Sequence, residues 1–344
     1  WVRLGLNWTV LGKGTAMDWL TQARWRFGRI GAGACVMLAV WGALNMVLGA
    51  LLVQMMGESA SDAPLWLVFL ISSGPLYLIA MPMGLMLMKA VPELPTRKFD
   101  MTPGRFFTLL LMCLPIMYGG SIIGNLLSAI LSDGTAENTI ASMAMTLDPS
   151  MIIFGVILGP IFEEWMFRKQ IISRTRRYGE KLSILLSALM FGLFHLNLFQ
   201  FFYAFGLGLM FGYVYMRTSQ LRYSIVMHMI INFNGSVLAP WVLSQVDLEA
   251  LATTDTTDAA AAQALLTQNG AGMMLVSGYG LLLIALSIAG VVLLITKRRT
   301  FEFYTTPEQL PKGLGGQTAF GNPGMVIYIA MCAALIALSM YGLF

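Results

Sequence analysis

Long apolar runs dominate this sequence. Only 11% of its 344 residues are charged, against about 25% in soluble domains. In lipid, only helices and closed barrels satisfy every backbone polar group, and a spanning helix needs about 20 apolar residues. The sequence therefore predicts an all-α, polytopic membrane helix bundle with eight or nine transmembrane helices. The expected spans lie near residues 30–56, 64–88, 105–131, 150–172, 182–198, 199–216, 223–245, 272–296 and 324–343.

The charges between these runs indicate an orientation. If the N-terminus is cytoplasmic, all 21 Lys and Arg fall in inner segments or at the adjoining helix ends. The outer segments 57–63, 132–149, 197–200 and 246–271 contain no Lys or Arg, and all of them except 197–200 carry acids. Such asymmetry is typical of the positive-inside rule. The basic residues are not gathered on one domain, so the expected partner is the lipid bilayer and not nucleic acid.

The runs divide the chain into four regions. Residues 1–29 are predicted to be a basic amphipathic segment in the inner interface, since apolar residues recur there at helical spacing. Residues 30–149 would form three accessory spans, 150–245 a core of four spans, and 246–344 an outer loop with two C-terminal spans. Within that loop, Thr257-Asp258 precedes Ala259, which predicts a short capped helix.

A few ionisable residues interrupt the apolar runs of the core. Glu163, Glu164 and Arg168 lie in the fourth run. His195 lies in the fifth and His228 in the seventh, and the chain has no other histidine. Any one of these residues could serve only packing or interhelical hydrogen bonding. Together, as the titratable groups of the spans, they indicate a functional site.

Helical geometry separates the two glutamates. Glu164 and Arg168 are four residues apart and can pair on one face, which offsets part of the cost of burying each charge. Glu163 points about 100° away from Glu164. It lacks Arg168 as a partner, so it is the better candidate to take a proton from water.

The remaining polar groups allow two kinds of chemistry. His228 and Asn232 are four residues apart and share a face, so both could donate hydrogen bonds to an oxyanion. Alternatively, Glu163, His195 and His228 could supply a His₂Glu zinc site with one open position, as in a metalloprotease. We favour a glutamate-activated water, because Asn is a poor zinc ligand.

Motifs of several other membrane enzymes are absent from the sequence. It contains no His-Glu-x-x-His, no Gly-x-Ser-Gly and no Gly-x-Gly-Asp. It also lacks a Walker-type Gly-Lys-Ser/Thr. These absences argue against a helical zinc protease motif, a rhomboid-type serine protease, an intramembrane aspartyl protease and an ATP-driven machine.

The polar core resembles the CPBP family of intramembrane proteases, also called the CAAX-protease and bacteriocin-processing or Abi family. The family pattern is Glu-Glu-x-x-x-Arg, then Phe-x-x-x-His, then His-x-x-x-Asn on successive helices. Here these motifs begin at Glu163, Phe191 and His228, in the same order. The resemblance covers roughly residues 150–240.

The resemblance implies an intramembrane endopeptidase, of the type of the CAAX prenyl protease, whose cavity opens to the cytoplasm. Its substrate would be a membrane-associated peptide or protein. By analogy, Glu163 and His195 would activate water, and His228 and Asn232 would stabilise the oxyanion. Glu164 and Arg168 would hold the site together, and zinc is left open as a cofactor. In the eukaryotic branch the substrate is a prenylated C-terminal tail, whereas the compact loops of this chain favour a bacterial plasma membrane.

Two other functions are compatible with these residues. A non-proteolytic immunity or scaffold protein of the same fold would use the polar cluster for structure alone. A proton-coupled transporter would use Glu163 and His195 as a relay. The transporter is the weaker alternative, because no internal repeat is visible in the sequence.

Overall fold

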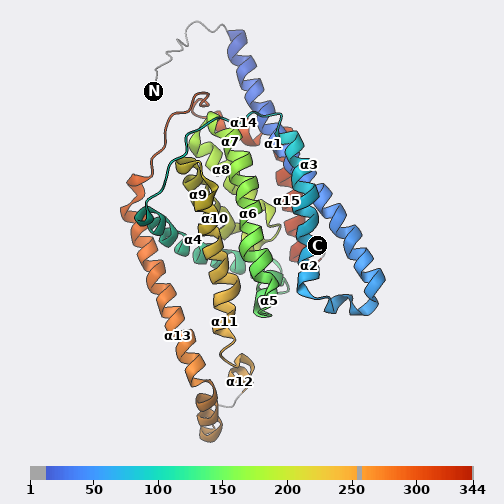
Figure 1. Ribbon diagram of the computed structural model, residues 1–344, viewed down its shortest axis with the longest axis vertical. Coiled ribbons are helices and arrows are strands. Elements are labelled where there is room, and N and C mark those ends of the chain that lie inside the picture. The colour runs from blue at the N-terminus through green and yellow to red at the C-terminus, as the bar shows by residue number, and fades with distance from the viewer. Residues whose placement is uncertain (1–12, 254–257, 343–344) are drawn as a thin grey trace.

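The computed structural model describes residues 13–253 and 258–342. All regular secondary structure in these two ranges is helical (Figure 1). Seven helical segments there are long and apolar enough to cross a membrane. The predicted all-α polytopic fold is thereby confirmed. The seven segments are Trp19–Asp62, Leu65–Met88, Pro103–Leu131, Leu198–Thr218, Leu221–Leu243, Thr267–Thr296 and Pro323–Met340.

The other two expected spans are also helical but differ from these seven. The fifth, α8 (Glu180–Phe194), has only 15 residues. The fourth carries four charged residues in its second half. It consists of the π-helix η3 (Met151–Leu158), α6 (Gly159–Glu164) and the π-helix η4 (Trp165–Ile172). Helices thus occupy all nine predicted positions, and seven of them satisfy both length and hydropathy.

The N-terminal region differs from its prediction. The helix α1 (Lys13–Met56) runs without a break through the expected boundary near residue 29. Ala23 and Phe27 are buried, and the Phe27 ring lies 5.1 Å from that of Tyr178. The apolar face therefore packs against the protein, so this part of α1 is not a separate interfacial helix. Residues 1–12 lie outside the described residues.

The helix expected in the outer loop is present but longer than predicted. Asp258 Oδ1 accepts a hydrogen bond from Ala260 N at 2.9 Å and caps the start of α13 (Ala259–Thr296). The helix then continues for 38 residues through the eighth span. Nothing breaks it, because Gly270 and Gly272 are tolerated inside a long helix. Thr257 lies outside the described residues.

Helices flank the core on two sides (Figure 1). On one side lie α1, α2 and α3, together with α15. On the other side lies α13, and α4 begins beside α13 and crosses behind the core helices. The remaining long elements are α2 (Leu65–Pro75), α3 (Met81–Met88), α4 (Pro103–Leu131), α9 (Leu198–Thr218), α10 (Leu221–Phe233) and α15 (Pro323–Met340). The short elements are η1 (Gly57–Asp62), η2 (Leu76–Ala80), α5 (Thr139–Met145), α7 (Ser173–Thr175), η5 (Arg176–Tyr178), η6 (Asn234–Leu238), α11 (Ala239–Leu243), α12 (Leu248–Thr253), η7 (Arg298–Thr300) and α14 (Gly315–Phe320).

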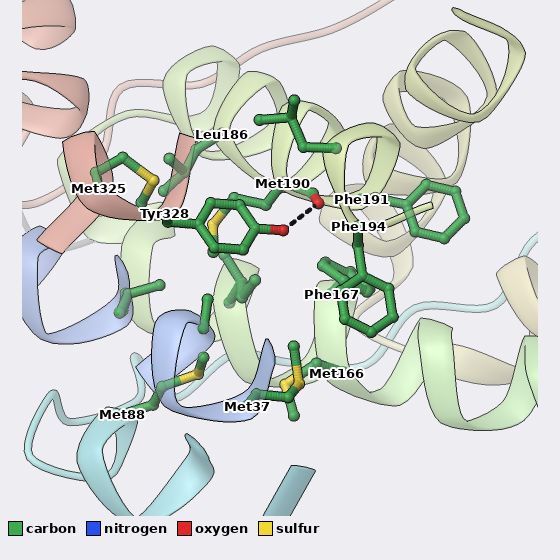
Figure 2. Packing of buried hydrophobic residues seen from close by; sticks show 14 of the residues in the cluster. Met37, Met88, Met166, Phe167, Leu186, Met190, Phe191, Phe194, Met325 and Tyr328 are labelled. Carbon is green, nitrogen blue, oxygen red and sulfur yellow. Dashed lines mark hydrogen bonds between the residues drawn. The ribbon is translucent and has the colours of Figure 1, made fainter. Parts of the chain in front are cut away.

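One apolar cluster joins the core to the first group of flanking helices. Figure 2 shows Met37 of α1, Met88 of α3 and Tyr328 of α15 around Phe167 and neighbouring core residues. The Tyr328 hydroxyl donates a 2.7 Å hydrogen bond to the Met190 carbonyl of α8 (Figure 2). This bond satisfies the polar atom of a ring that is otherwise fully buried.

A second cluster joins the core to α4 and α13, and glycines let these helices approach closely. A Cβ on Gly120 of α4 would lie 2.5 Å from the Tyr203 nitrogen of α9. A Cβ on Gly290 of α13 would lie 2.3 Å from the Leu111 carbonyl of α4. A side chain at either position would clash, so these helix pairs depend on glycine. The flanking helices thereby hold α8, α9 and α10 in place.

Ion pairs join the ends of the helices around the loop between α3 and α4. Glu93, between α3 and α4, contacts Lys169 Nζ at 2.5 Å and Arg174 Nη1 at 3.1 Å. Partial burial of Glu93 opposes its ionisation, but the two cations outweigh this and hold the pKa of Glu93 below its ordinary value of 4.5. Lys169 and Arg174 follow Glu163 and Glu164 on the same helical stretch. The loop between α3 and α4 therefore restrains, through Glu93, the end of the stretch that carries the candidate site.

Candidate active site

A fully buried ion pair lies at the centre of the polar cluster. Arg168 Nε donates to Glu164 Oε2 at 3.0 Å, and Arg168 Nη2 donates to Glu164 Oε1 at 3.1 Å. Both side chains have no solvent-accessible surface. This two-pronged geometry is the strong form of the Arg–carboxylate interaction, and it confirms the pairing that the four-residue spacing predicted.

The guanidinium of Arg168 is further fixed by the next helix. Its Nη1 donates to Ser187 Oγ of α8 at 3.0 Å, and Ser187 Oγ donates to the Phe167 carbonyl at 2.8 Å. The ring of Phe191 lies 4.5 Å from the guanidinium carbon in a cation–π contact. Arg168 therefore ties η4 to α8, and its charge is fully compensated without solvent.

His228 of α10 lies between the two glutamates. Its Nδ1 is 3.2 Å from Glu164 Oε1, and its Nε2 is 3.7 Å from Glu163 Oε2. An ionised carboxylate can only accept, so Nδ1 carries the proton toward Glu164. The imidazole stacks on Phe211 with centroids 5.1 Å apart. These contacts fix the ring and direct Nε2 toward Glu163.

Glu163 is the more exposed of the two glutamates. Its side chain is 21% exposed, whereas that of Glu164 is completely buried. It belongs to α6, a stretch of six residues between two π-helical segments. π-Helical turns are frequent at functional sites. Glu163 is therefore the carboxylate of the pair that a molecule outside the packed core can reach.

His195 follows the last residue of α8 and caps that helix. Its Nδ1 is 2.8 Å from the Phe191 carbonyl. A carbonyl can only accept, so Nδ1 carries a hydrogen and Nε2 of the neutral ring holds a free lone pair. His195 is close enough to Glu163 for an electrostatic interaction between them. The fold thus brings Glu163 near both histidines of the chain.

Asn232 lies one turn after His228 on α10. Its Nδ2 donates a 2.9 Å hydrogen bond to the Gly155 carbonyl of η3. The amide has two N–H groups, so one is engaged with the backbone and one is left for a ligand. Asn232 therefore also joins α10 to the helix that carries Glu163.

Several residues near this cluster had no signal in the sequence. Ser187 holds Arg168, and the hydroxyls of Tyr77 and Tyr203 lie within electrostatic range of Glu163. Gln200 Nε2 donates to the Tyr203 hydroxyl at 2.9 Å. Serine and tyrosine are common in membrane helices. Only the fold, which brings η2 and α9 close to Glu163, distinguishes Tyr77 and Tyr203 from the other tyrosines.

The histidines and acids do not form a metal-ligand set. Within residues 13–253 and 258–342, no three His, Cys, Asp or Glu side chains are grouped to hold one metal ion. Nδ1 of His228 faces Glu164 and Nδ1 of His195 faces the Phe191 carbonyl, so only the two Nε2 atoms could bind a metal. Because Glu163, His195 and His228 are not grouped around one point, they do not fit the His₂Glu zinc arrangement in this structure, and we derive no step through zinc.

The central part of the chain resembles a known family. Residues 146–234 match the family model described as type II CAAX prenyl endopeptidase Rce1-like. This segment is Rce1-like. It runs from the residues before η3 to the start of η6, and it contains the two glutamates, Arg168, both histidines and Asn232. The resemblance to the CPBP family is thereby confirmed for this segment, and it associates the segment with protease activity.

Other comparisons concern the whole chain. Comparison with curated proteins and with solved structures gave no significant match.

Proposed function

We propose that this protein is an intramembrane endopeptidase in which Glu163 activates a water molecule. The observation that carries the proposal is the difference between the two glutamates. Glu164 is buried and paired with Arg168, whereas the Glu163 side chain is 21% exposed and lies 3.7 Å from His228 Nε2. Glu164 therefore has the environment of a residue that stabilises the fold. Glu163 has the environment of a general base, and both lie in the segment that resembles an endopeptidase.

In the proposed reaction, Glu163 removes a proton from water as the water oxygen attacks the carbonyl carbon of the scissile peptide bond. The Nε2 lone pair of His195 orients the same water. The carbonyl oxygen becomes an oxyanion, which accepts hydrogen bonds from the His228 side chain and from the free amide N–H of Asn232. When the C–N bond breaks, the leaving nitrogen takes the proton back from Glu163, which regenerates the carboxylate.

We propose that the substrate is a membrane-associated peptide or protein, and that the enzyme is a multi-pass protein of a bacterial plasma membrane with its N-terminus in the cytoplasm. All Lys and Arg of the chain lie on the side that the positive-inside rule assigns to the cytoplasm. The helices that carry the site are embedded among apolar spans. A substrate must therefore reach Glu163 from within or beside the bilayer.

The experiment is cleavage of a mixture of membrane-active peptides by the purified protein in nonionic micelles, with products identified by mass spectrometry. In ¹⁸O water, each new carboxyl terminus should carry one ¹⁸O atom. Glu163→Gln should abolish these products, whereas Glu137→Gln should not, because Glu137 is an exposed acid of the outer loop. Unlabelled products or full activity of Glu163→Gln would contradict the proposal.

A non-proteolytic scaffold or immunity role is the second candidate. The buried Glu164–Arg168–Ser187 network favours it, because such a network can stabilise the bundle without chemistry. In that case, Glu163→Gln would leave the biological phenotype intact. Loss of the phenotype at unchanged stability would exclude this candidate.

A further inference from the structure

A polar cavity lies away from the candidate active site. It has a volume of about 300 Å³ and lies between the first turns of α4, the end of α13 and the segment that follows α13. In Figure 1 the end of α13 lies beside one end of α4. The cavity is within the size range of small-ligand sites. None of its lining residues belongs to the cluster around Glu163.

Two cations from different helices line this cavity. Arg105 is the third residue of the span Pro103–Leu131, and Lys297 directly follows the span Thr267–Thr296. Both therefore lie where an apolar span ends on the side with all the basic residues. This is the level at which phospholipid phosphates are found. Arg298 and Arg299 follow directly, so the local charge is positive.

The cavity wall combines hydroxyl groups with apolar side chains. Thr108 and Thr300 line it, with their hydroxyls donating to the Gly104 and Lys297 carbonyls, and Leu109 and Met112 supply an apolar surface. The latter two lie deeper along α4 than Arg105, because α4 runs from this interface into the membrane. A ligand that is both phosphorylated and hydrophobic fits this order of groups, whereas an inorganic anion would use only the polar half.

One acid also lines the cavity. The carboxylate of Glu302 accepts a 2.7 Å hydrogen bond from the Tyr304 hydroxyl. With Arg105 and Lys297, the lining keeps a net positive charge. Arg105 Nη2 also donates to the Tyr213 hydroxyl of α9 at 2.8 Å, which links the cavity to the Rce1-like segment.

We propose that this cavity binds the phosphate of an anionic phospholipid between Arg105 and Lys297, with the start of its acyl chains along Leu109 and Met112. The bound lipid fills the space between α4 and α13 at the cytoplasmic interface. It steadies Arg105, and through it Tyr213. The proposal concerns binding alone and does not depend on peptidase activity.

The test is native mass spectrometry of the purified full chain in nonionic detergent, titrated with dihexanoyl phosphatidylglycerol. The Lys297→Gln variant is the cleanest, because the Lys297 side chain makes no hydrogen bond or ion pair with the described residues. Its loss therefore removes no folding contact. Arg105→Gln is the second variant, and Arg105→Gln/Lys297→Gln should bind roughly tenfold or more weakly than wild type.

The control Arg222→Gln/Lys312→Gln removes the same charge from two cations that lie outside the cavity. It should bind the lipid like wild type. If Lys297→Gln and the double variant bind as tightly as wild type, or if the control loses affinity equally, the site is overturned. If inorganic phosphate competes at the same concentration as the lipid, the ligand is free phosphate and the lipid assignment is overturned.

Discussion

Removing Arg168 should be among the most destabilising single changes in the core. In Arg168→Met, the carboxylate of Glu164 would stay fully buried but would lose both of its guanidinium hydrogen bonds. Loss of one partner of a buried ion pair costs about 3–5 kcal/mol, and Glu164 would keep only weaker compensation from the 3.2 Å contact with His228 Nδ1. The lost cation–π contact with Phe191 adds about 1–2 kcal/mol, part of which the packing of the methionine side chain recovers.

A double variant tests whether the unpaired charge is the main cost. Glu164→Gln/Arg168→Met removes both charges, so it should be at least about 2 kcal/mol more stable than Arg168→Met alone. Arg222→Met is the control. Arg222 pairs with Asp100 at the surface with 60% of its side chain exposed, and exposed pairs contribute about 0–1 kcal/mol.

The assay is equilibrium unfolding in mixed micelles, with an increasing mole fraction of sodium dodecyl sulfate and detection by tryptophan fluorescence. We expect the order of stability to be wild type and Arg222→Met, then the double variant, then Arg168→Met. If the free energy of unfolding of Arg168→Met lies within about 1 kcal/mol of the wild-type value, the prediction is wrong, since a buried carboxylate without its guanidinium partner should destabilise the protein by more than that. A double variant as unstable as Arg168→Met would refute the charge argument.

Two further predictions concern helix packing and pH. Gly290→Ala should destabilise the protein and loosen α13 from α4. Gly278→Ala should be neutral or stabilising by up to about 1 kcal/mol, because a Cβ at position 278 meets nothing within 4 Å. Thermal unfolding in detergent compares the two variants, and equal effects would contradict the close crossing of α13 and α4 at Gly290. Because the folded pKa of Glu93 lies below 4.5, the stability that its pairs with Lys169 and Arg174 contribute is complete above that pH and is lost as the pH falls through the lower folded value. Wild type should therefore exceed Glu93→Gln in stability at pH 6, and the two should converge in acid. A constant difference down to pH 3 would count against these ion pairs.

The sequence was sufficient to predict what depends on local spacing. The apolar runs predicted the helices, and the four-residue separation of Glu164 and Arg168 predicted their pair. The same reasoning placed His228 and Asn232 on one face of a helix. Each of these depends only on the pitch of an α-helix and on the cost of charge in lipid, so no tertiary information was needed.

Contacts between distant segments could not be predicted in this way. The spacing of the histidines gives no reason for Nδ1 of His228 to face Glu164 and Nε2 to face Glu163, since this depends on how α10 docks against α6. The Asn232 bond to the Gly155 carbonyl also depends on that docking. The continuity of α1 was missed because the apolar residues near Phe27 fit an interfacial helix as well as a packed one.

The central claim is that Glu163 is the base that activates water. The most direct measurement is the single-turnover rate of peptide cleavage by Glu163→Gln and wild type, at matched stability in mixed-micelle unfolding. The account predicts a rate at least about 100-fold lower for Glu163→Gln, the smaller end of what general base catalysis contributes, with unfolding unchanged because Glu163 is partly exposed and outside the Glu164–Arg168 pair. An equal rate for the two proteins would contradict it.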